Sequence, residues 1–307
     1  MRRAAALAVL IWMGAAAHAA PAGAATRHYW VAAVPVTWNI VPNQRDAIMR
    51  VRHPPSETVF GTVVYRRYTR GWKRPMRNTP PGSSNQDLMP GPLIRARVGD
   101  RVRVHFKNLD TVFRRSHSMH FHGVRYRPSS DGAFVPGFSG GDGDVKLGRS
   151  WTYRLRAGGD SIGAWPYHDH SRSMHESIEG GMWGMLSILG RHEQAPDREF
   201  VVVFAPMGRF QSIDGRAFVG NTPVFTAFVG QLVQWDVMAM GSEHHTFHVH
   251  GHRWQERGTD VDTRTVGPAE SFRIRWREQD PGTWLYHCHV ETHMEQGMIG
   301  IYRVARR

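Results

Sequence analysis

The stretch Tyr286-His287-Cys288-His289-Val290-Glu291-Thr292-His293 contains the single cysteine of this 307-residue sequence, between two histidines, and Met298 follows shortly after it. A lone cysteine has no disulfide partner within the chain, and a cysteine that only fills a core needs no metal ligands beside it. A thiolate, two imidazoles and a weakly bound thioether are the ligands of a blue-copper electron-transfer centre. Cys288, His293 and Met298 supply three such ligands, and the remaining histidine must come from elsewhere.

If this stretch is a β-strand, successive side chains point to opposite faces of the sheet. Cys288 then faces one way, while His287 and His289 face the other. One strand can therefore connect two metal sites through a few covalent bonds.

The stretch has a counterpart in the first half of the chain, Tyr167-His168-Asp169-His170. Each copy is followed by a Gly-Met-x-Gly segment. Two further pairs of segments match in the same order: residues 92–100 resemble 223–231, and residues 117–123 resemble 245–251. Two copies of one domain are the simplest explanation for matches that keep their order.

Runs of β-branched and aromatic residues alternate with turns, and no segment keeps a helical period, so an all-β chain of two sandwich domains is expected. Residues 29–39 are predicted to form an extended arm or an edge strand, because Pro35 interrupts them. Residues 58–68 are predicted to form a strand and residues 71–92 a loop.

The polar segment 191–198 predicts the linker, with an N-terminal domain at residues 21–192 and a C-terminal domain at residues 193–307. Residues 1–20 are predicted to be a signal peptide, because two arginines precede a small-residue apolar run and an Ala-His-Ala cleavage site. The protein is therefore expected to be secreted, periplasmic or on the cell surface, by the Sec or the twin-arginine route. No other apolar run is long enough to cross a bilayer.

The formal net charge is +13, and nearly all of the basic residues are arginines. These arginines are spread along the whole chain instead of clustering with aromatic residues, as a nucleic-acid surface would require. A solvated basic surface is expected, and a nucleic-acid partner is not.

The two copies differ where the second has Cys288 and the first has Asp169. A carboxylate cannot form the copper–thiolate bond of a blue centre, so the first domain is expected to lack that metal. His117 and His175 are interpreted as remnants of the lost site, and surface or hydrogen-bonding roles are favoured for them over continued metal binding.

Pairs of the form His-x-His recur in the sequence, at His120/His122, His168/His170, His248/His250, His250/His252 and His287/His289. On a strand, each pair places two imidazoles on one face. Two pairs from each repeat give eight convergent imidazoles, whereas structural zinc closes at four ligands and more often recruits thiolates. His245 lies three residues before His248, on the opposite strand face, where it can join Cys288.

These motifs (H-x-H-G, H-x-H, H-x-x-H-x-H and H-C-H-x3-H-x4-M) resemble, in their order, those of the multicopper oxidases. The similarity runs from about Pro92 to Met298 and is greatest to the two-domain bacterial small laccases. Residues 129–132 and 262–269 are similar to that subgroup as well. The resemblance implies two cupredoxin-like Greek-key β-sandwich domains in tandem.

The resemblance also implies four copper ions per chain equivalent, with roles for particular residues. The type 1 copper would be held by His245, Cys288, His293 and Met298. The type 2 copper would be held by His120 and His248, and the type 3 pair by His122, His168, His170, His250, His287 and His289. Tyr126, Asp131 and Asp262 occupy positions near the trinuclear cluster, where the two aspartates either relay protons or orient a ligand imidazole. His252 is not a ligand in the family.

The activity implied is that of a laccase. Phenols or aromatic amines would give up single electrons at the type 1 copper, Cys288 would pass them on through its histidine neighbours, and dioxygen would be reduced to water. Since each half carries four cluster histidines, the small laccases imply a homotrimer whose trinuclear clusters lie between subunits.

Other functions compete with this one. A metallo-oxidase of Cu(I), Fe(II) or Mn(II) is the nearest alternative, and the scattered methionines do not favour it. Copper nitrite reductase shares the two-domain architecture but keeps its blue site in the first domain, where Asp169 stands here. A copper carrier without catalysis would need the Cys288 site but not the other histidine pairs.

Overall fold

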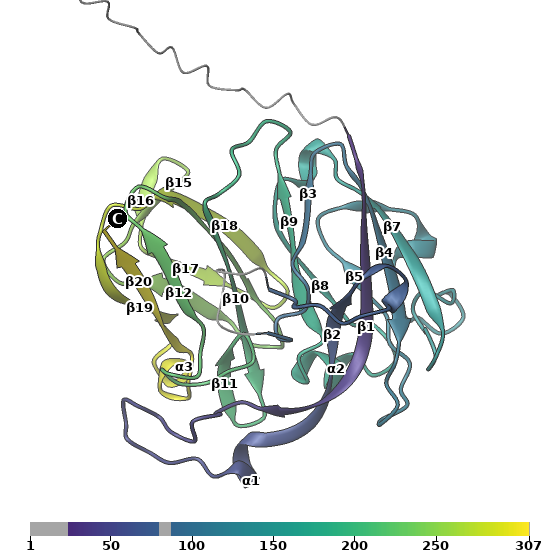
Figure 1. Ribbon diagram of the computed structural model, residues 1–307, viewed down its shortest axis with the longest axis horizontal. Coiled ribbons are helices and arrows are strands. Elements are labelled where there is room, and N and C mark those ends of the chain that lie inside the picture. Colours follow the sequence, from purple (N-terminus) through teal and green to yellow (C-terminus); the bar gives the residue numbers. More distant parts are fainter. Residues whose placement is uncertain (1–23, 80–86, 307) are drawn as a thin grey trace, which may run out of the picture.

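The structure is a computed structural model in which residues 24–79 and 87–306 are described. The predicted signal peptide lies outside the described residues. Two β-sandwiches lie side by side, one built from the N-terminal and one from the C-terminal part of the chain (Figure 1). Among the described residues, none of the helices has the length and apolar character that crossing a bilayer requires.

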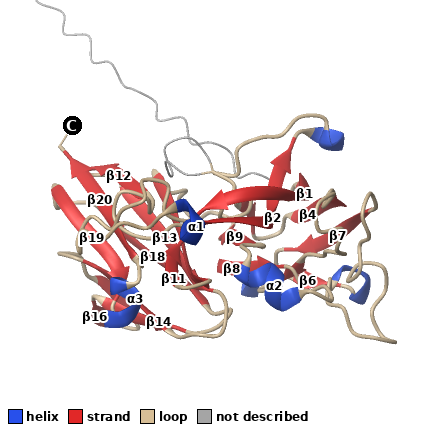
Figure 2. Cartoon of the chain, turned by 90° about the horizontal axis from the view of Figure 1, so that it is seen from below, coloured by secondary structure: helices blue, strands red, loops and turns tan. Residues whose placement is uncertain are grey.

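The first sandwich consists of two facing sheets. One sheet has the strand order β2 (Val59–Tyr68), β1 (Thr26–Asn39), β4 (Arg101–Asn108), β7 (Ser150–Arg156), β6 (Arg125–Tyr126). The other has the order β3 (Ile94–Arg97), β9 (Trp183–Leu189), β8 (Gly163–His168), β5 (His120–Phe121). The helical segments are short and lie outside the sheets: α1 (Pro55–Thr58), η1 (Arg70–Trp72), η2 (Pro128–Ser130), η3 (Gly159–Ser161), α2 (Met174–Glu179) (Figure 2).

The second sandwich repeats this plan. Its first sheet has the order β11 (Phe210–Ile213), β10 (Arg198–Met207), β13 (Leu232–Ala239), β18 (Ser271–Arg277). Its second has the order β12 (Val224–Phe228), β20 (Ile299–Ala305), β19 (Gly282–Cys288), β14 (His245–Val249), β17 (Thr263–Val266). A small ribbon, β15 (Trp254–Glu256) with β16 (Thr259–Val261), and helix α3 (Glu291–Glu295) complete it.

Strand pairing confirms the internal repeat. β1 runs parallel to β4 as β10 does to β13, and β3 runs parallel to β9 as β12 does to β20. The strands that carry the histidine pairs are antiparallel neighbours in both copies, β5 with β8 and β14 with β19. The predicted all-β fold, two Greek-key sandwiches in tandem, is therefore confirmed.

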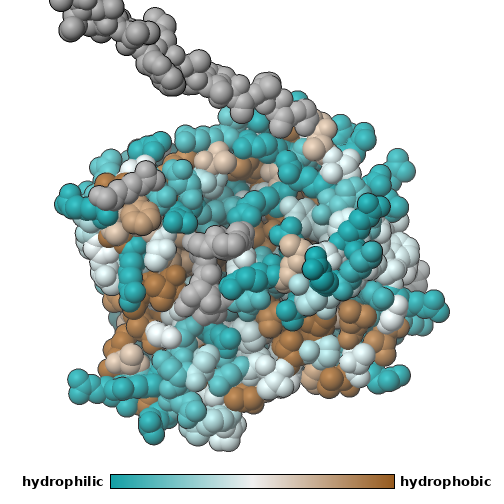
Figure 3. All heavy atoms as spheres, in the orientation of Figure 1, coloured by the Kyte–Doolittle hydropathy of each residue, from teal (hydrophilic) through white to brown (hydrophobic). Residues whose placement is uncertain are grey.

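Each sandwich has its own apolar core, and a third core lies between the two sandwiches. In this third core, fully buried Trp183 and Met185 of the first sandwich share a cluster with Val203 and Met238 of the second. The surface presents mainly hydrophilic side chains on the face shown in Figure 3, with smaller apolar areas between them.

The prediction for residues 29–39 was only partly right. β1 lies between β2 and β4, and its residues 30–33 pair with both strands, so this part is not at an edge of the sheet. Beyond that, residues 34–39 pair with β2 alone, and Pro35 falls in this part of the strand. Pro35 can thus lack an N–H donor on the side where β4 no longer follows.

Trp235 is fully buried in the core of the second sandwich, against Phe200, Phe225 and Tyr302. We expect Trp235→Ala to lower the free energy of unfolding by about 3–5 kcal/mol, because the lost contacts leave a cavity. Urea denaturation of the wild type and the variant measures this change in the free energy of unfolding. Phe138→Ala, at a side chain that is 90% exposed, is the matched control and should change stability by no more than about 0.5 kcal/mol. Equal effects of the two changes would contradict the assignment of Trp235 to the core.

Candidate metal centre

His245, Cys288 and His293 converge from three elements of the second sandwich: β14, the end of β19 and helix α3. The Cys288 sulfur lies 3.8 Å from Nδ1 of His245 and 3.7 Å from Nδ1 of His293. The two Nδ1 atoms are 3.1 Å apart. Cys288 and Met298 are both fully buried in the surrounding apolar core, and the Cys288 N–H donates to the Met298 carbonyl at 3.1 Å.

The spacing of these three atoms fits one metal ion. Imidazole nitrogen and thiolate sulfur bind a late first-row metal at about 2.0 and 2.3 Å, which places nitrogen and sulfur about 3.5–3.8 Å apart around it. The sulfur–nitrogen distances fall within that range. A thiolate with two imidazoles and a buried thioether nearby is a donor set that copper prefers.

The protonation states of this group suit metal binding. Burial, helped by the neighbouring His293, lowers the pKa of His245 to about 3, so its ring is neutral at pH 7. Burial raises the pKa of the Cys288 thiol. A bound cation reverses that effect, because it stabilises the thiolate directly.

The histidine pairs of the second repeat gather on the other side of β19. Ligand atoms of His248, His250 and His287 lie within 4.8 Å of one another, and Nε2 of His250 is 3.0 Å from Nε2 of His287. The His289 ring lies 5.7 Å from His248 and 5.4 Å from His287, measured between ring centroids. Strand β19 therefore carries Cys288 toward the core and its two histidine neighbours toward a separate cluster.

The first repeat builds a matching cluster from β5 and β8. Nε2 of His122 is 3.2 Å from Nε2 of His168. The His120 ring lies 5.5 Å from His168 and 5.3 Å from His170, again between ring centroids. The eight histidines predicted as cluster ligands are thus brought together as two sets of four.

Main-chain carbonyls orient the rings in the same way in both sets. His120 Nδ1 donates to the Asp131 carbonyl and His248 Nδ1 to the Asp262 carbonyl, each at 2.7 Å. On β8 and β19, His168 and His287 donate from Nδ1 to the carbonyl of the following residue, at 2.9 and 2.8 Å. Each of these hydrogen bonds leaves the Nε2 lone pair available for a metal.

Burial keeps several of these rings neutral. Burial and the neighbouring imidazoles together lower the pKa of His122, His168 and His287 to about 4 in each case. A metal binds the unprotonated nitrogen of a neutral imidazole. Because these rings are already neutral at pH 7, copper binding does not have to displace a proton from them.

The glycine after each His-x-His pair has a defined structural role. Gly123 has φ +69°, and a Cβ there would lie 1.9 Å from the Trp165 ring. Gly251 has φ +71°, and a Cβ there would lie 2.6 Å from the Trp284 ring. Only glycine combines the left-handed backbone with room for the indole, which explains the H-x-H-G motif in both repeats.

Asp131 and Tyr126 lie beside the first histidine set, and Asp262 lies beside the second. The main-chain carbonyls of the two aspartates, not their carboxylates, accept the hydrogen bonds that orient the His120 and His248 rings. The Asp131 carboxylate is 3.6 Å from His120 Nδ1. Burial and the adjacent Asp131 carboxylate raise the pKa of Tyr126 to about 12.

His252, Glu278 and Asp280 form another group of potential ligands. The Glu278 carboxylate already accepts from His252 Nε2 at 3.1 Å, from the Trp276 indole at 3.0 Å and from two main-chain N–H groups. His252 Nδ1 donates to the His250 carbonyl at 2.7 Å. This group is therefore a satisfied hydrogen-bond network that supports the loop of His250.

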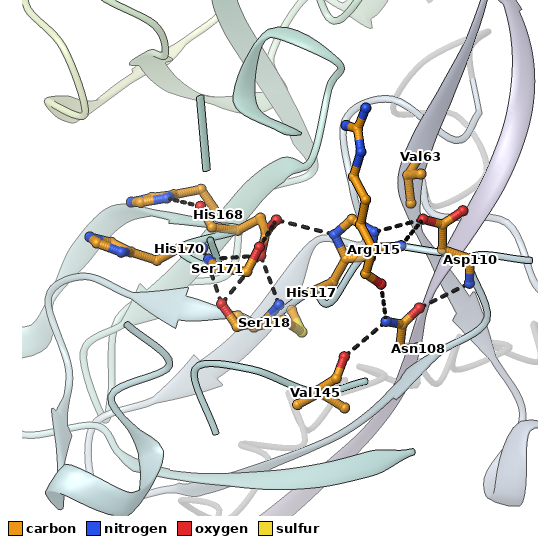
Figure 4. A network of polar contacts seen from close by, with 12 residues as sticks. Val63, Asn108, Asp110, Arg115, His117, Ser118, Val145, His168, His170 and Ser171 are labelled. Carbon is orange, nitrogen blue, oxygen red and sulfur yellow. Dashed lines mark hydrogen bonds and ion pairs between the residues drawn. The ribbon is translucent and has the colours of Figure 1, made fainter. Parts of the chain in front are cut away.

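His117 and His175, interpreted as remnants of one site, have different surroundings. His175 is on the surface in α2, where Nε2 is 3.4 Å from Glu179. His117 is buried, and its two ring nitrogens are each 3.2 Å from a carboxylate oxygen, of Asp169 and of Asp110 (Figure 4). Burial opposes a charge there, but the two carboxylates raise the pKa of His117, and the pKa of Asp110 falls to about 2.

Sequence patterns did not reveal Glu243. Its carboxylate lies 3.2 Å from Nε2 of His293, on the side of the ring that faces away from Cys288, and it accepts a hydrogen bond from Gln211 at 2.6 Å. The Glu243 side chain is 44% exposed. It therefore connects the solvent to the edge of the His293 ring.

The two histidine sets stay separate within one chain. Across residues 24–79 and 87–306, no hydrogen bond or ring contact joins a histidine of the first set to one of the second. Each set presents four imidazoles from one sandwich only. A metal cluster that needs histidines from both sets therefore cannot form from the two sets of a single chain as they lie here.

Comparison with known proteins assigns both halves to one family. Residues 75–193 and residues 192–307 each match a family model described as multicopper oxidase. The chain is 32% identical, over 70% of its length, to a probable nitrite reductase–hydroxylamine oxidoreductase fusion protein of Kuenenia stuttgartiensis. It is 27% identical, over 92% of its length, to ferroxidase HEPHL1 of Homo sapiens. It spans only 27% and 29% of those two proteins.

A solved structure of a multicopper oxidase has the same fold. It superposes with a TM-score of 0.69 at 23% identity and covers 91% of this chain and 89% of its own. The likeness supports the two-sandwich fold described above.

Proposed function

This chain belongs to the multicopper oxidase family, and from that premise we propose that it is a laccase-like oxidase of phenols and aromatic amines that uses dioxygen as acceptor. The observation that carries the proposal is the arrangement around β19. The group of His245, Cys288 and His293 lies on one side of that strand, and the second-domain histidine set, suited to a second centre, lies on the other.

Residue roles follow from these positions. We assign His245, Cys288, His293 and Met298 to a type 1 copper. We assign a type 2 copper to His120 and His248, and the type 3 pair to the six other histidines: His122, His168, His170, His250, His287 and His289. When bound, these four coppers supply one-electron oxidation of the substrate and reduction of dioxygen to water.

The chain's own residues link the two centres. Cys288 is covalently joined to His287 and His289, and the hydrogen bond from His287 Nδ1 to the Cys288 carbonyl adds a shorter route. Since main-chain carbonyls already orient His120 and His248, the carboxylates of Asp131 and Asp262 are free to deliver protons. Proton delivery is therefore the role we propose for both aspartates.

The separate histidine sets also support the homotrimer. In that assembly the first-domain set of one chain meets the second-domain set of its neighbour, and each junction contains one complete cluster. Export through the signal peptide at residues 1–20 is part of the same proposal, and N-terminal sequencing of the mature protein tests it.

A metallo-oxidase is the second candidate, and Glu243 is the observation that favours it. A carboxylate beside the exposed edge of His293 can hold a harder cation such as Fe(II) or Mn(II) next to the electron acceptor, whereas Cu(I) prefers softer ligands. The same carboxylate can accept the proton of a phenol. Oxygen-consumption assays on the copper-loaded protein, with phenols, aromatic amines and these three cations, test the function. No uptake with any of them would reject both candidates.

The Glu243→Gln variant distinguishes the laccase-like function from the metallo-oxidase function. We expect phenol turnover to fall about 10- to 100-fold, because a charged hydrogen bond contributes about 1.5–3 kcal/mol. Turnover of a neutral ferrocene, which has no proton to lose, should stay within about twofold. Glu295→Gln, at an exposed position of the helix that carries His293, is the control. A loss confined to the metal cations would assign the protein to the metallo-oxidases.

A further inference from the structure

The first sandwich contains a buried charged network where the second has its sulfur-centred group. His117 lies between Asp110 and Asp169, and all three side chains are no more than 1% exposed. Figure 4 shows the His117 ring between the Asp110 side and the Ser118–His170 side of the network. Both ring nitrogens face carboxylate oxygens, so both donate.

The network occupies the position that corresponds to the Cys288 group. The Asp169 N–H donates to the Met182 carbonyl at 3.0 Å, as the Cys288 N–H does to Met298 at 3.1 Å. His117 precedes His120 by three residues, as His245 precedes His248. The second sandwich thus joins the strands of His245 and Cys288 through potential metal ligands. The first sandwich joins the corresponding segments through a histidine between two carboxylates.

Asp169 also connects this network to the histidine set. Its Oδ1 accepts from the Ser118 N–H at 2.7 Å and from the Ser118 hydroxyl at 3.2 Å. The same hydroxyl accepts from the His170 N–H at 3.1 Å. The Asp169 carboxylate also accepts from the Ser171 hydroxyl at 2.9 Å. The main-chain carbonyl of Asp169 accepts from His168 Nδ1.

Asp110 anchors the other end. Its carboxylate accepts from the N–H groups of Phe113 and Arg115, at 2.9 and 3.1 Å. Every charged group of the network therefore has partners, and a fully satisfied buried network is rigid, whereas a partly satisfied one is not.

We propose that Asp110, His117 and Asp169 are positioning residues that hold the first-domain histidine set ready for copper without a metal of their own. In the second domain, the metal held by Cys288 would tie β14 to β19. In the first, the network ties the segment of Ser118 to that of His170 and so fixes the backbone from which His168 and His170 project. The inference rests on the proposed function, since it concerns copper held by these histidines.

Asp169→Ala tests it. The change removes the link from His117 to Ser118 and Ser171, while the type 1 group in the other sandwich keeps every contact. We expect copper bound at the type 2 and type 3 positions to weaken by about 10- to 100-fold, the usual effect of losing a residue that orients metal ligands. The blue absorption should be unchanged. Electron paramagnetic resonance and copper analysis during titration with Cu(II) measure both centres separately.

Asp169→Asn is the conservative variant. Its amide oxygen can still accept from Ser118, and its NH2 group can donate to a neutral His117, so it should recover most of the copper binding. Ser118→Ala is a smaller change that cuts the Asp169–Ser118–His170 connection, and it carries the test if Asp169→Ala does not fold. It should weaken the same sites in the same direction.

Asp100→Ala is the matched control. Asp100 is a buried carboxylate of the same sandwich that accepts from Ala25 and Arg97 and does not contact the histidine strands. It should lower the melting temperature without selective loss of type 2 and type 3 copper. The inference is overturned if Asp169→Ala and Ser118→Ala keep these coppers, or if they lose the blue copper equally. A wild-type protein that binds no trinuclear copper would instead reject the proposed function.

Discussion

The Cys288→Ser variant is expected to lose turnover with every reducing substrate, down to the detection limit of an oxygen electrode. The sequence has a single cysteine, and its sulfur lies 3.8 and 3.7 Å from the imidazole nitrogens of His245 and His293. A serine oxygen is a shorter and harder donor than a thiolate and does not give the copper–thiolate bond. The first sandwich offers no substitute, because Asp169 takes the corresponding position.

The same variant should keep its trinuclear copper. His287 and His289 point away from the mutated side chain, and their contacts to His248 and His250 do not involve it. Loss of the blue absorption with retention of the type 2 resonance is the signature to look for. Met294→Leu, on the same short helix as His293, is the control and should keep both. Turnover of organic reductants by Cys288→Ser would contradict the assignment of Cys288 as the point of electron entry.

Co-expression of two inactive variants should restore activity. His170→Ala damages the first-domain set and His250→Ala the second-domain set, so each variant alone should consume no oxygen. In a mixed ring, some junctions combine the intact first domain of one chain with the intact second domain of the other. Random assembly at equal amounts makes about a quarter of the junctions complete, so about a quarter of the wild-type activity is expected.

This recovery is specific to clusters shared between chains. If each chain completed its own cluster, both variants would remain defective in every mixture. Two chains that both carry His170→Ala provide the control for expression level. Absence of recovery in rings shown by mass spectrometry to contain both variants would rule out the shared cluster, even if blue copper is present in all of them.

Much of the site was predictable because metal chemistry restricts both residue type and spacing. A cysteine flanked by histidines on a strand must place them on opposite faces, and the parity of His245 relative to His248 placed it with Cys288. The structure brings these residues together in that way. The residues that sequence did not reveal, Glu243, Asp110 and Glu278, share no spacing with their histidine partners. Their contacts arise only when separate loops meet in the folded chain.

The two aspartates show a different limit of sequence reasoning. Asp131 and Asp262 were expected near the trinuclear cluster, where they either relay protons or orient a ligand imidazole. The rings are oriented by the carbonyls at those positions instead. A carbonyl is present at every residue, so no residue type marks this role in a sequence.

The apolar core between the sandwiches has a consequence for symmetry. Because Trp183 and Met238 are packed into one cluster, the two histidine faces of a chain are held at a fixed angle to each other. A head-to-tail contact repeated between copies closes into a ring only if its rotation divides a full turn, and otherwise it continues as a helical filament. If copper clusters join neighbouring chains, the packing of this core sets how many copies close the ring, although none of the core's residues is itself an assigned copper ligand.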